Sequence, residues 1–307
     1  MRTKQQLTDD IRSERRAALV VNARSRRGRQ FYDDAHARLQ AAGFKLLGSY
    51  GVEGDLERSL QQAIDLGPDL LVAGGGDGTI STAGRMLAHR DMALGLLPLG
   101  TTNNFARTVG IPPDLDTAVA TMTEGAVIDV DLGIAGDMPF TNHVGVGLSA
   151  EVMINAPSRL KRAIGRFAYP ITALGLLRKH RPLRATVRAG GREIVFATHQ
   201  VYVANGGFHA GRPITADAHA DDRLLVAYPV GGATRRELLR ETARNALTGH
   251  RRTLHERPFL AVGELWLETD RPAAVEVDGE PCGQTPLRIA LDANALRIMA
   301  PPGTEDH

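Results

Sequence analysis

The sequence predicts a doubly wound parallel α/β domain, followed by an antiparallel β-sandwich with helical insertions. Two observations indicate this fold class. In the first half, short apolar runs alternate with helical patterns, which is typical of βαβ units and a parallel sheet. From about Val127 on, many short strand-like runs follow one another between Gly, Pro and Asp turns, which favours a sandwich or barrel.

The first half contains four apolar runs that we expect to form the parallel sheet, at residues 17–22, 44–49, 70–73 and 93–97. The third run is apolar on both faces, as central parallel strands tend to be. Helical patterns follow at residues 31–42, 56–66 and 79–88, and Thr79 or Ser81 is expected to cap the last helix. Because such sheets bind ligands beyond the carboxyl ends of their strands, we expect a binding site at that edge of the sheet.

The second half contains strand-like segments such as RATVRA, RLLVAYPV and ELWLETD, each bounded by turn residues. Two helical insertions are expected, near residues 159–179 and 235–247. The change of rhythm predicts domains at residues 1–128 and 129–300. It leaves open whether the C-terminal segment returns to the first domain.

Composition excludes several classes of protein. The chain has 307 residues, 43% of them hydrophobic, and a formal net charge of +2, which is too small to indicate a nucleic-acid partner. Cys282 is the only cysteine, so an intrachain disulfide is excluded. No signal-peptide core and no apolar run of about 18 residues is present. We expect a cytoplasmic protein with at most peripheral membrane association.

The segment "DLLVAGGGDGTISTAGRML" places a glycine-rich turn between a strand and a helix. Gly75, Gly76 and Gly78 let a ligand approach the main chain, and the helix N-terminus offers N–H groups to phosphate. Asp77 could hold Mg²⁺ or accept a hydrogen bond from a ligand hydroxyl. The alternative is a tight turn whose aspartate caps the helix.

A second polar loop, "LPLGTTNNFAR", follows the next strand. Gly100 gives backbone freedom, Thr101 offers a hydroxyl, and Asn103 offers an amide that can bind a base, ribose or phosphate. Alone, this loop could be an Asn-capped helix start. Since it ends a strand adjacent to the first loop, we expect the two loops to converge.

The first strand also ends in polar residues, in the segment "ALVVNARSRRGR". Asn22, Arg24, Arg26 and Arg27 could bind phosphate oxygens. The alternative is a solvated basic turn.

The segment "VEVDGEPCG" lies in the all-β half and contains Asp278 and Glu280. Asp-Gly is a frequent hairpin signal, so an ordinary turn is one interpretation. The other is that a carboxylate on a rigid turn removes a proton from an alcohol. Which of the two acids would be the base stays open.

Together these motifs resemble the diacylglycerol kinase catalytic-domain family, which includes bacterial soluble lipid kinases and sphingosine and ceramide kinases. The segments "VNARSRRG", "GGDGTI", "LPLGTTNNFAR", "NHVGVGLSAEV", "VANG" and "VDGE" occur in the family's order. The resemblance implies a nucleotide-binding domain similar to NAD kinase and phosphofructokinase, a β-sandwich, and an active site in the cleft between them. It implies transfer of the γ-phosphoryl group of ATP, with Mg²⁺, to a hydroxyl of a membrane lipid, diacylglycerol-like or sphingoid.

The resemblance also implies roles for residues. Glu280, with Asp278 beside it, would accept the proton, and Asp77 would act at the metal. The expected nucleotide-binding residues are Gly75, Gly76, Asp77, Gly78, Thr79, Ile80, Ser81, Gly100, Thr101, Asn103 and Asn22. Some bacterial members bind a structural Mg²⁺, which would correspond here to Asp222 and the carbonyls of His219 and Leu224.

Departures from the family pattern leave other functions open. Asn104 replaces a frequent aspartate, while Arg223 and Val226 replace the glycine and the second aspartate of another family motif. They motivate a non-enzymatic nucleotide or lipid sensor as an alternative. A third interpretation is a kinase of a small soluble substrate, similar to NAD kinase.

The expected partners are ATP and a lipid at the membrane surface, with no nucleic acid and with a homodimer left open. An apolar stretch at residues 167–177 is flanked by basic residues, which is typical of a helix at an anionic membrane surface. The alternative is a core-packed helix with solvated ends. The basic residues are Arg159, Lys161, Arg162, Arg166, Arg178, Lys179, Arg181 and Arg184.

Overall fold

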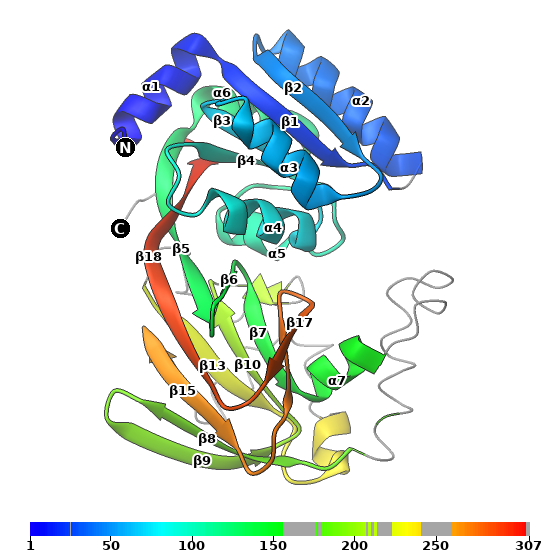
Figure 1. The fold of residues 1–307 in the computed structure, drawn as a ribbon, viewed down its shortest axis with the longest axis vertical. Helices are drawn as coiled ribbons and strands as arrows, with labels where there is room; N and C mark the ends of the chain where they lie inside the picture. Colours follow the sequence, from blue (N-terminus) through cyan, green and yellow to red (C-terminus); the bar gives the residue numbers. More distant parts are fainter. Residues whose placement is uncertain are drawn as a thin grey trace. The chain divides into compact units, whose positions relative to one another are not determined.

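The computed structural model describes residues 1–24, 26–155, 176, 180–206, 208–209, 212–213, 223–240 and 260–304. These residues divide into two compact units, whose secondary structure Figure 1 labels. The first unit contains Met1–Leu132 and the chain from Asp292 on, and the second contains the described residues between Gly133 and Leu291. The first unit is α/β and the second is antiparallel β, so the predicted fold class is confirmed.

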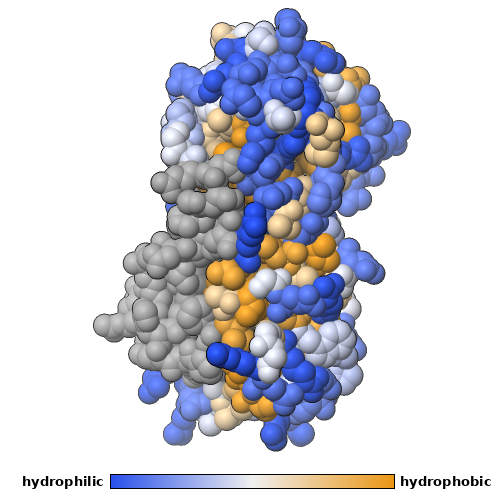
Figure 2. Space-filling model, turned by 90° about the vertical axis from the view of Figure 1, so that its left-hand side faces the viewer, coloured by the Kyte–Doolittle hydropathy of each residue, from blue (hydrophilic) through white to orange (hydrophobic). Residues whose placement is uncertain are grey.

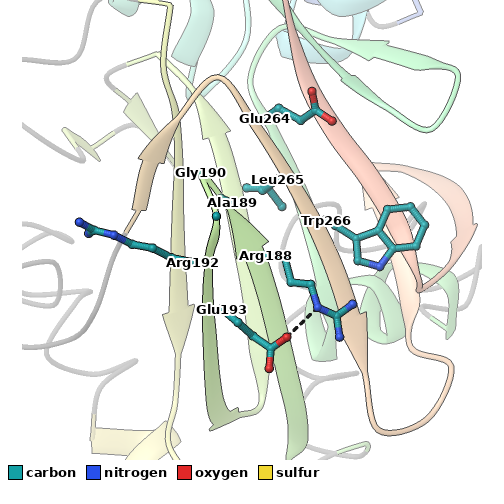
Figure 3. A pocket seen from close by; sticks show the side chains of 9 residues that line it. Arg188, Ala189, Gly190, Arg192, Glu193, Glu264, Leu265 and Trp266 are labelled. Carbon is teal, nitrogen blue, oxygen red and sulfur yellow. Dashed lines mark hydrogen bonds and ion pairs between the residues drawn. The ribbon is translucent and has the colours of Figure 1, made fainter.

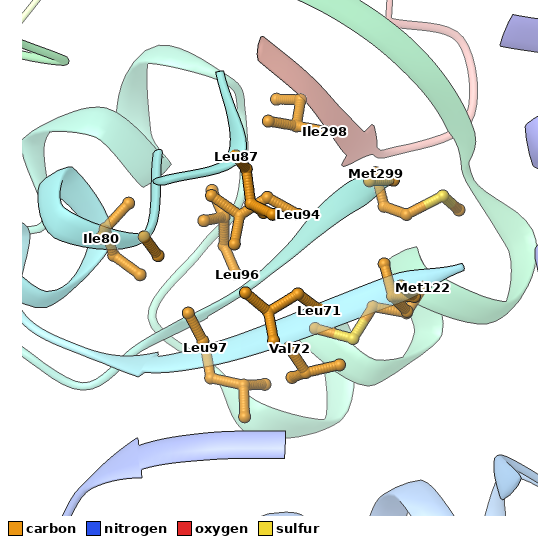
Figure 4. Packing of buried hydrophobic residues seen from close by; sticks show 14 of the residues in the cluster. Leu71, Val72, Ile80, Leu87, Leu94, Leu96, Leu97, Met122, Ile298 and Met299 are labelled. Atoms are coloured by element: carbon orange, nitrogen blue, oxygen red, sulfur yellow. The ribbon is translucent and has the colours of Figure 1, made fainter. Parts of the chain in front are cut away.

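The first unit is built on a parallel sheet in the order β2-β1-β3-β4-β18. Its two central strands, β3 and β4, are buried along their whole length, because helices cover both faces. Figure 4 shows how leucines of these strands pack against α4, α6 and the end of β18. The strands are β1 (Arg16–Asn22), β2 (Lys45–Val52), β3 (Leu70–Gly75), β4 (Ala93–Pro98) and β18 (Leu287–Ala300).

The helices of the first unit are α1 (Lys4–Glu14), α2 (Arg26–Ala41), α3 (Leu56–Asp65), α4 (Asp77–Leu87), α5 (Asn104–Thr108) and α6 (Leu115–Glu124). The polar N-terminal segment was not expected to be helical. It forms α1 because Thr3 and Gln6 make a capping box, and Leu7 and Ile11 become buried one turn apart.

The expected cap of the helix after β3 is wrong. The strand continues through Gly75, the chain turns at Gly76, and α4 begins at Asp77 without a side-chain cap. Thr79 and Ser81 therefore lie inside the helix, where they are 5% and 1% exposed.

An ionic cluster around Arg2 joins α1 to the amino-terminal ends of the central strands. Arg2 donates to Asp10 at 2.8 Å and to Asp69, just before β3, at 2.6 Å. It also donates to Asp91, before β4, at 3.1 Å, and Arg297 of β18 binds the same carboxylate at 2.9 Å. Burial opposes the charge on Arg2, but its three carboxylate partners raise its pKa above the usual value. The cluster thus links α1, β3, β4 and β18.

We predict that Arg2→Ala lowers the free energy of unfolding by about 2 kcal/mol, because it leaves the buried Asp69 carboxylate without its close partner. Arg29→Ala is the control. It breaks a pair with Glu53 in which the side chains are 62% and 58% exposed, and should cost less than about 1 kcal/mol. Chemical denaturation of both variants measures the difference, and equal losses would contradict the role given to Arg2.

The second unit has a six-stranded antiparallel sheet in the order β14-β13-β10-β7-β16-β17. Alternate residues such as Val144, Val203 and Val275 share a core with Val187 and Leu265 of the other layer, as in a sandwich. The strands of this sheet are β7 (His143–Gly147), β10 (Gln200–Asn205), β13 (Leu225–Val230), β14 (Leu260–Val262), β16 (Ala274–Val277) and β17 (Glu280–Gln284). The other layer contains β6 (Met138–Phe140), β8 (Leu183–Ala189), β9 (Arg192–Thr198), β15 (Glu264–Thr269), part of β18 and the end of β5 (Ala126–Ala135), most of which belongs to the first unit.

The outer face of the six-stranded sheet packs on α7 (Leu148–Asn155) through a separate apolar cluster that includes Val152, Tyr228 and Leu238. The short strands β11 (Phe208–His209) and β12 (Arg212–Pro213) pair with each other. On the face drawn in Figure 2, hydrophobic side chains gather on this unit. Ile154 and Leu239 are among its exposed large hydrophobic residues.

Two sequence predictions lie mainly outside the described residues. Of the basic helix predicted at 159–179, only Leu176 is described, and of the helix at 235–247 only residues 235–240, which are helical. Within the described ranges, no helix combines the length and apolar character needed to cross a bilayer.

Candidate functional site

The two glycine loops of the first unit lie against each other, as the sequence predicts. A Cβ atom on Gly100 would lie 2.6 Å from the Cα atom of Gly76, which is closer than atoms can pack. The Leu99 N–H donates to the Gly75 carbonyl at 2.9 Å. Since these loops end the adjacent strands β3 and β4, they form one continuous backbone surface at the carboxyl edge of the sheet.

Asp77 joins the beginnings of two helices. Its Oδ2 accepts a hydrogen bond from the Thr102 hydroxyl at 2.7 Å, and its Oδ1 accepts one from the Phe105 N–H at 3.4 Å. The carboxylate therefore connects α4 to the loop that leads into α5. The sequence "GTTNN" offers the hydroxyls of both Thr101 and Thr102, and the structure shows that the Thr102 hydroxyl binds Asp77.

Asn103 shapes the second loop from inside. It has a left-handed backbone, with φ 47° and ψ 51°, and its side chain is buried. Its Oδ1 accepts from the Gly100 N–H at 2.8 Å, and its Nδ2 donates to the carbonyls of Gly100 at 3.1 Å and Pro98 at 3.3 Å. The Asn103 amide thus closes the loop, and its contact with a nucleotide stays a prediction.

Asn22 connects the end of β1 to the same surface. Its Nδ2 donates to the Thr79 hydroxyl at 3.3 Å, and its Oδ1 accepts from the Arg24 N–H at 3.4 Å. The Arg24 guanidinium donates to the Gly54 carbonyl at 2.7 Å. The side chains of Arg26 and Arg27 lie outside the described residues.

The predicted nucleotide-binding residues divide by exposure. Gly78, Gly100 and Thr101 are exposed, and Asn22, Gly76 and Asp77 are partly exposed. The first N–H groups of α4 have no partner within the helix, so this edge can bind an anion. The other predicted residues lie buried beneath it, and they are Gly75, Thr79, Ile80, Ser81 and Asn103.

We predict that Gly100→Ala separates the two loops, because the new Cβ would overlap both Gly76 and the Asn103 side chain. Nucleotide affinity should fall about tenfold or more, since the anion-binding N–H groups lose their common alignment. Gly54→Ala is the control, because its Cβ would meet no atom within 4 Å. Calorimetric titration with nucleotide measures the affinity of both variants. Unchanged affinity in Gly100→Ala would exclude this surface as the nucleotide-binding site.

In the second unit, "VDGE" forms a two-residue hairpin between β16 and β17. Asp278 and Gly279 have φ values of 48° and 86°, both in the left-handed region that such turns require. The hairpin interpretation is therefore correct. It does not exclude a chemical role for Glu280, which is exposed at the start of β17.

The Asp278 carboxylate accepts four hydrogen bonds from the segment that leads into β7. Oδ2 accepts from the Thr141 N–H at 2.8 Å and its hydroxyl at 3.1 Å. Oδ1 accepts from the N–H groups of Asn142 at 3.0 Å and His143 at 2.8 Å. These four hydrogen bonds make the carboxylate an anchor of the turn.

Glu276, which sequence reasoning missed, lies beneath the same turn and is 4% exposed. Its Oε2 accepts from the Gly279 N–H at 2.9 Å, and its Oε1 lies 3.2 Å from His143 Nε2. Burial acts to raise the pKa of Glu276, but His143 and the Gly279 N–H outweigh it and leave the pKa below its usual value. The only sequence signal was an acid inside an apolar strand.

Two tyrosines complete the surroundings of Glu276. The Tyr202 ring lies 5.7 Å from His143 and 5.7 Å from Tyr228, measured between ring centroids. Burial and the charge of Glu276 raise the pKa of Tyr202, against the effect of a hydrogen bond with Ser149. The pKa of Tyr228 is raised by burial as well, so both phenols stay protonated. Among Glu276, Tyr202 and Tyr228, the negative charge is therefore on Glu276.

The second unit also has a surface hollow of about 550 Å³ at the β8–β9 hairpin, beside Trp266 (Figure 3). Arg188, Glu193 and Glu264 in its lining form ion pairs, as in Arg188–Glu193 at 2.7 Å and Glu264–Arg288 at 2.6 Å. None of the residues singled out by the sequence motifs lines it.

The predicted structural metal site lies mainly outside the described residues. His219 and Asp222 are not described, and Leu224 is an exposed residue just before β13. Within the part of the chain that the structure describes, no group of three or more His, Cys, Asp or Glu residues could hold a metal ion.

Two family models match the chain. Residues 16–135 match the diacylglycerol kinase catalytic domain, and residues 142–300 match the YegS C-terminal NAD kinase beta sandwich-like domain. A Pseudomonas fluorescens Pf-5 protein named "Probable lipid kinase YegS-like" is 31% identical, with coverage of 94% of this chain and 96% of the relative. A Stenotrophomonas maltophilia K279a protein of the same name is 32% identical, with coverage of 82% and 85%.

Solved structures share the fold. A structure described as a diacylglycerol kinase from Bacillus anthracis str. Sterne aligns with a TM-score of 0.73 and 24% identity, covering 95% of this chain and 99% of that one. A second structure from the same strain aligns with a TM-score of 0.75 and 23% identity. Both units thus have counterparts in one known two-part architecture.

Proposed function

The chain belongs to the diacylglycerol kinase catalytic-domain family and is a kinase, and we propose that it transfers the γ-phosphoryl group of ATP to a hydroxyl of a membrane lipid. The observation that supports this most is the joined surface of the two glycine loops. It presents the backbone N–H groups of a helix N-terminus at the carboxyl edge of a parallel sheet, where phosphates bind. Phosphoryl transfer depends chiefly on such positioning and charge stabilisation.

In this proposal, the exposed residues Gly78, Gly100 and Thr101 contact the nucleotide directly. The buried residues Thr79 and Asn103 hold the loops in place. This division follows their exposure and their hydrogen bonds.

We propose Asp77 as the residue that holds Mg²⁺ together with the nucleotide phosphates. Its two oxygens each accept one protein hydrogen bond and each keep a further lone pair, which fits a hard cation that prefers oxygen ligands. When bound, Mg²⁺ neutralises charge on the phosphates. Thr102 and the Phe105 N–H orient the carboxylate.

We propose Glu280 as the proton acceptor and Asp278 as the residue that anchors its turn. Asp278 already accepts four hydrogen bonds from Thr141, Asn142 and His143, whereas Glu280 is exposed. A carboxylate at the start of a strand, beyond a rigid turn, can take the proton of an incoming hydroxyl.

The lipid acceptor is supported by the names of the relatives and by exposed hydrophobic side chains on the second unit, such as Ile154 and Leu239. We propose that the protein meets its substrate at the membrane surface by peripheral association. The acceptor is of the diacylglycerol or sphingoid type, both of which present a hydroxyl near the headgroup region.

Incubation with ATP, Mg²⁺ and a total lipid extract, followed by mass spectrometry, tests the proposal. A phosphorylated lipid is the expected product. Nucleotide binding without transfer to any lipid would exclude the lipid kinase activity. It would support a sensor if small alcohols also fail as acceptors.

We predict that Glu280→Gln lowers the rate of transfer about 10²-fold or more, because the general base is lost. Nucleotide affinity should stay at the wild-type value, since the loops that bind phosphate are in the first unit. Gln284→Ala, at the other end of β17, is the control for perturbing this strand. Transfer at the wild-type rate in Glu280→Gln would remove Glu280 from the mechanism.

A further inference from the structure

A buried carboxylate and an imidazole support the turn that carries Glu280. Glu276 accepts from the Gly279 N–H at 2.9 Å, one residue before Glu280, and its other oxygen lies 3.2 Å from His143 Nε2. His143 also donates its backbone N–H to Asp278 at 2.8 Å and accepts from the Asp278 N–H at 2.9 Å. The turn is thus held at three of its groups, one by the Glu276 side chain and two by the His143 main chain.

The place of the Glu276 carboxylate is fixed by close packing over β7. A Cβ atom on Gly145 would overlap Glu276 Oε1 and would lie 2.6 Å from the Ser149 hydroxyl. Ser149 lies beside Tyr202, whose ring packs against His143. The carboxylate therefore occupies space that only a glycine at position 145 leaves open.

Burying a charged carboxylate is costly, and a neutral side chain could fill this space at lower cost. What a carboxylate adds is a strong hydrogen bond to the Gly279 N–H and a second contact, to the His143 imidazole. The first acts directly on the backbone that sets the direction of Glu280, and the second holds the residue whose main chain binds Asp278. They are the interactions expected of a group that holds a reactive side chain in place.

We propose that Glu276, with His143, is a positioning residue for Glu280: it fixes the Asp278–Gly279 turn from which the proton acceptor projects. This inference rests on the proposed kinase function and on the assignment of Glu280 as base. It adds two residues to the mechanism that no sequence motif singled out.

The test compares Glu276→Gln, Glu280→Gln and the double variant in the lipid phosphorylation assay. Glu276→Gln should lower kcat about tenfold or more with KM for ATP unchanged, because the base is misplaced while the nucleotide loops are untouched. If Glu276 acts through Glu280, the double variant should be no slower than Glu280→Gln alone. If kcat of the double variant is lower than that of Glu280→Gln by the same factor that Glu276→Gln alone loses, the proposal is overturned.

Glu151→Gln is the matched control. Glu151 binds the buried His180 imidazole at 2.8 Å in the same unit, and among the described residues none of its hydrogen bonds reaches the turn. The substitution Glu151→Gln therefore removes a second carboxylate–imidazole pair of the same unit. In this variant kcat should change less than about twofold. A loss equal to that of Glu276→Gln would mean that both pairs are merely structural.

Amide exchange at Gly279 gives a readout that needs no substrate. In Glu276→Ala the Gly279 N–H should exchange at least about tenfold faster than in the wild type, and in Glu151→Gln it should be unchanged. Unchanged exchange in Glu276→Ala would overturn the positioning role. Suppose that exchange at Gly279 is faster in Glu276→Ala but the wild-type protein phosphorylates no lipid. The proposed kinase function is then wrong, whereas the support of the turn by Glu276 is confirmed.

Discussion

The backbone contact between Gly76 and Gly100 is the constraint on which the proposed nucleotide surface depends. Parallel pairing of β3 and β4 brings the two strand ends to the same edge, but only glycines let the following loops approach so closely. The Asp77–Thr102 hydrogen bond and the Asn103 amide then fix the loops in this arrangement. In the proposed function, the main-chain N–H groups of this surface bind phosphate, and side chains that face inward hold the loops that carry them.

In the second unit, the turn between β16 and β17 carries three acidic residues whose surroundings differ. Glu276 is buried and paired, Asp278 is saturated with hydrogen bonds, and Glu280 is exposed. Alternation along β16 and the two left-handed residues of the turn decide which surroundings each carboxylate meets. A general base needs an accessible carboxylate on a rigid support, and the two inner acids provide that support.

The sequence predicted the fold class, most strands of the first unit to within a few residues, and the convergence of the two glycine loops. These features follow from local periodicity and from the rule that parallel strands end at one edge. It could not predict that Asn103 faces inward, or that Asp77 binds Thr102, because both depend on the path of a loop. His143 and Glu276 are 133 residues apart in the chain, and only the pairing of β7 with β16 brings them together. The sequence predicts that the helix after β3 starts at Thr79, because glycines usually end a strand. In the structure Gly74 and Gly75 continue β3, and α4 starts at Asp77.

The strand β18 has a consequence for how the molecule is made. It completes the parallel sheet of the first unit beside β4, and its Arg297 joins the Arg2 cluster, yet it follows the second unit in the chain. During synthesis, the first unit therefore stays without its last strand until the sandwich has been translated. The parallel sheet of the first unit is therefore begun early in translation, and it can be completed only after the second unit has been made.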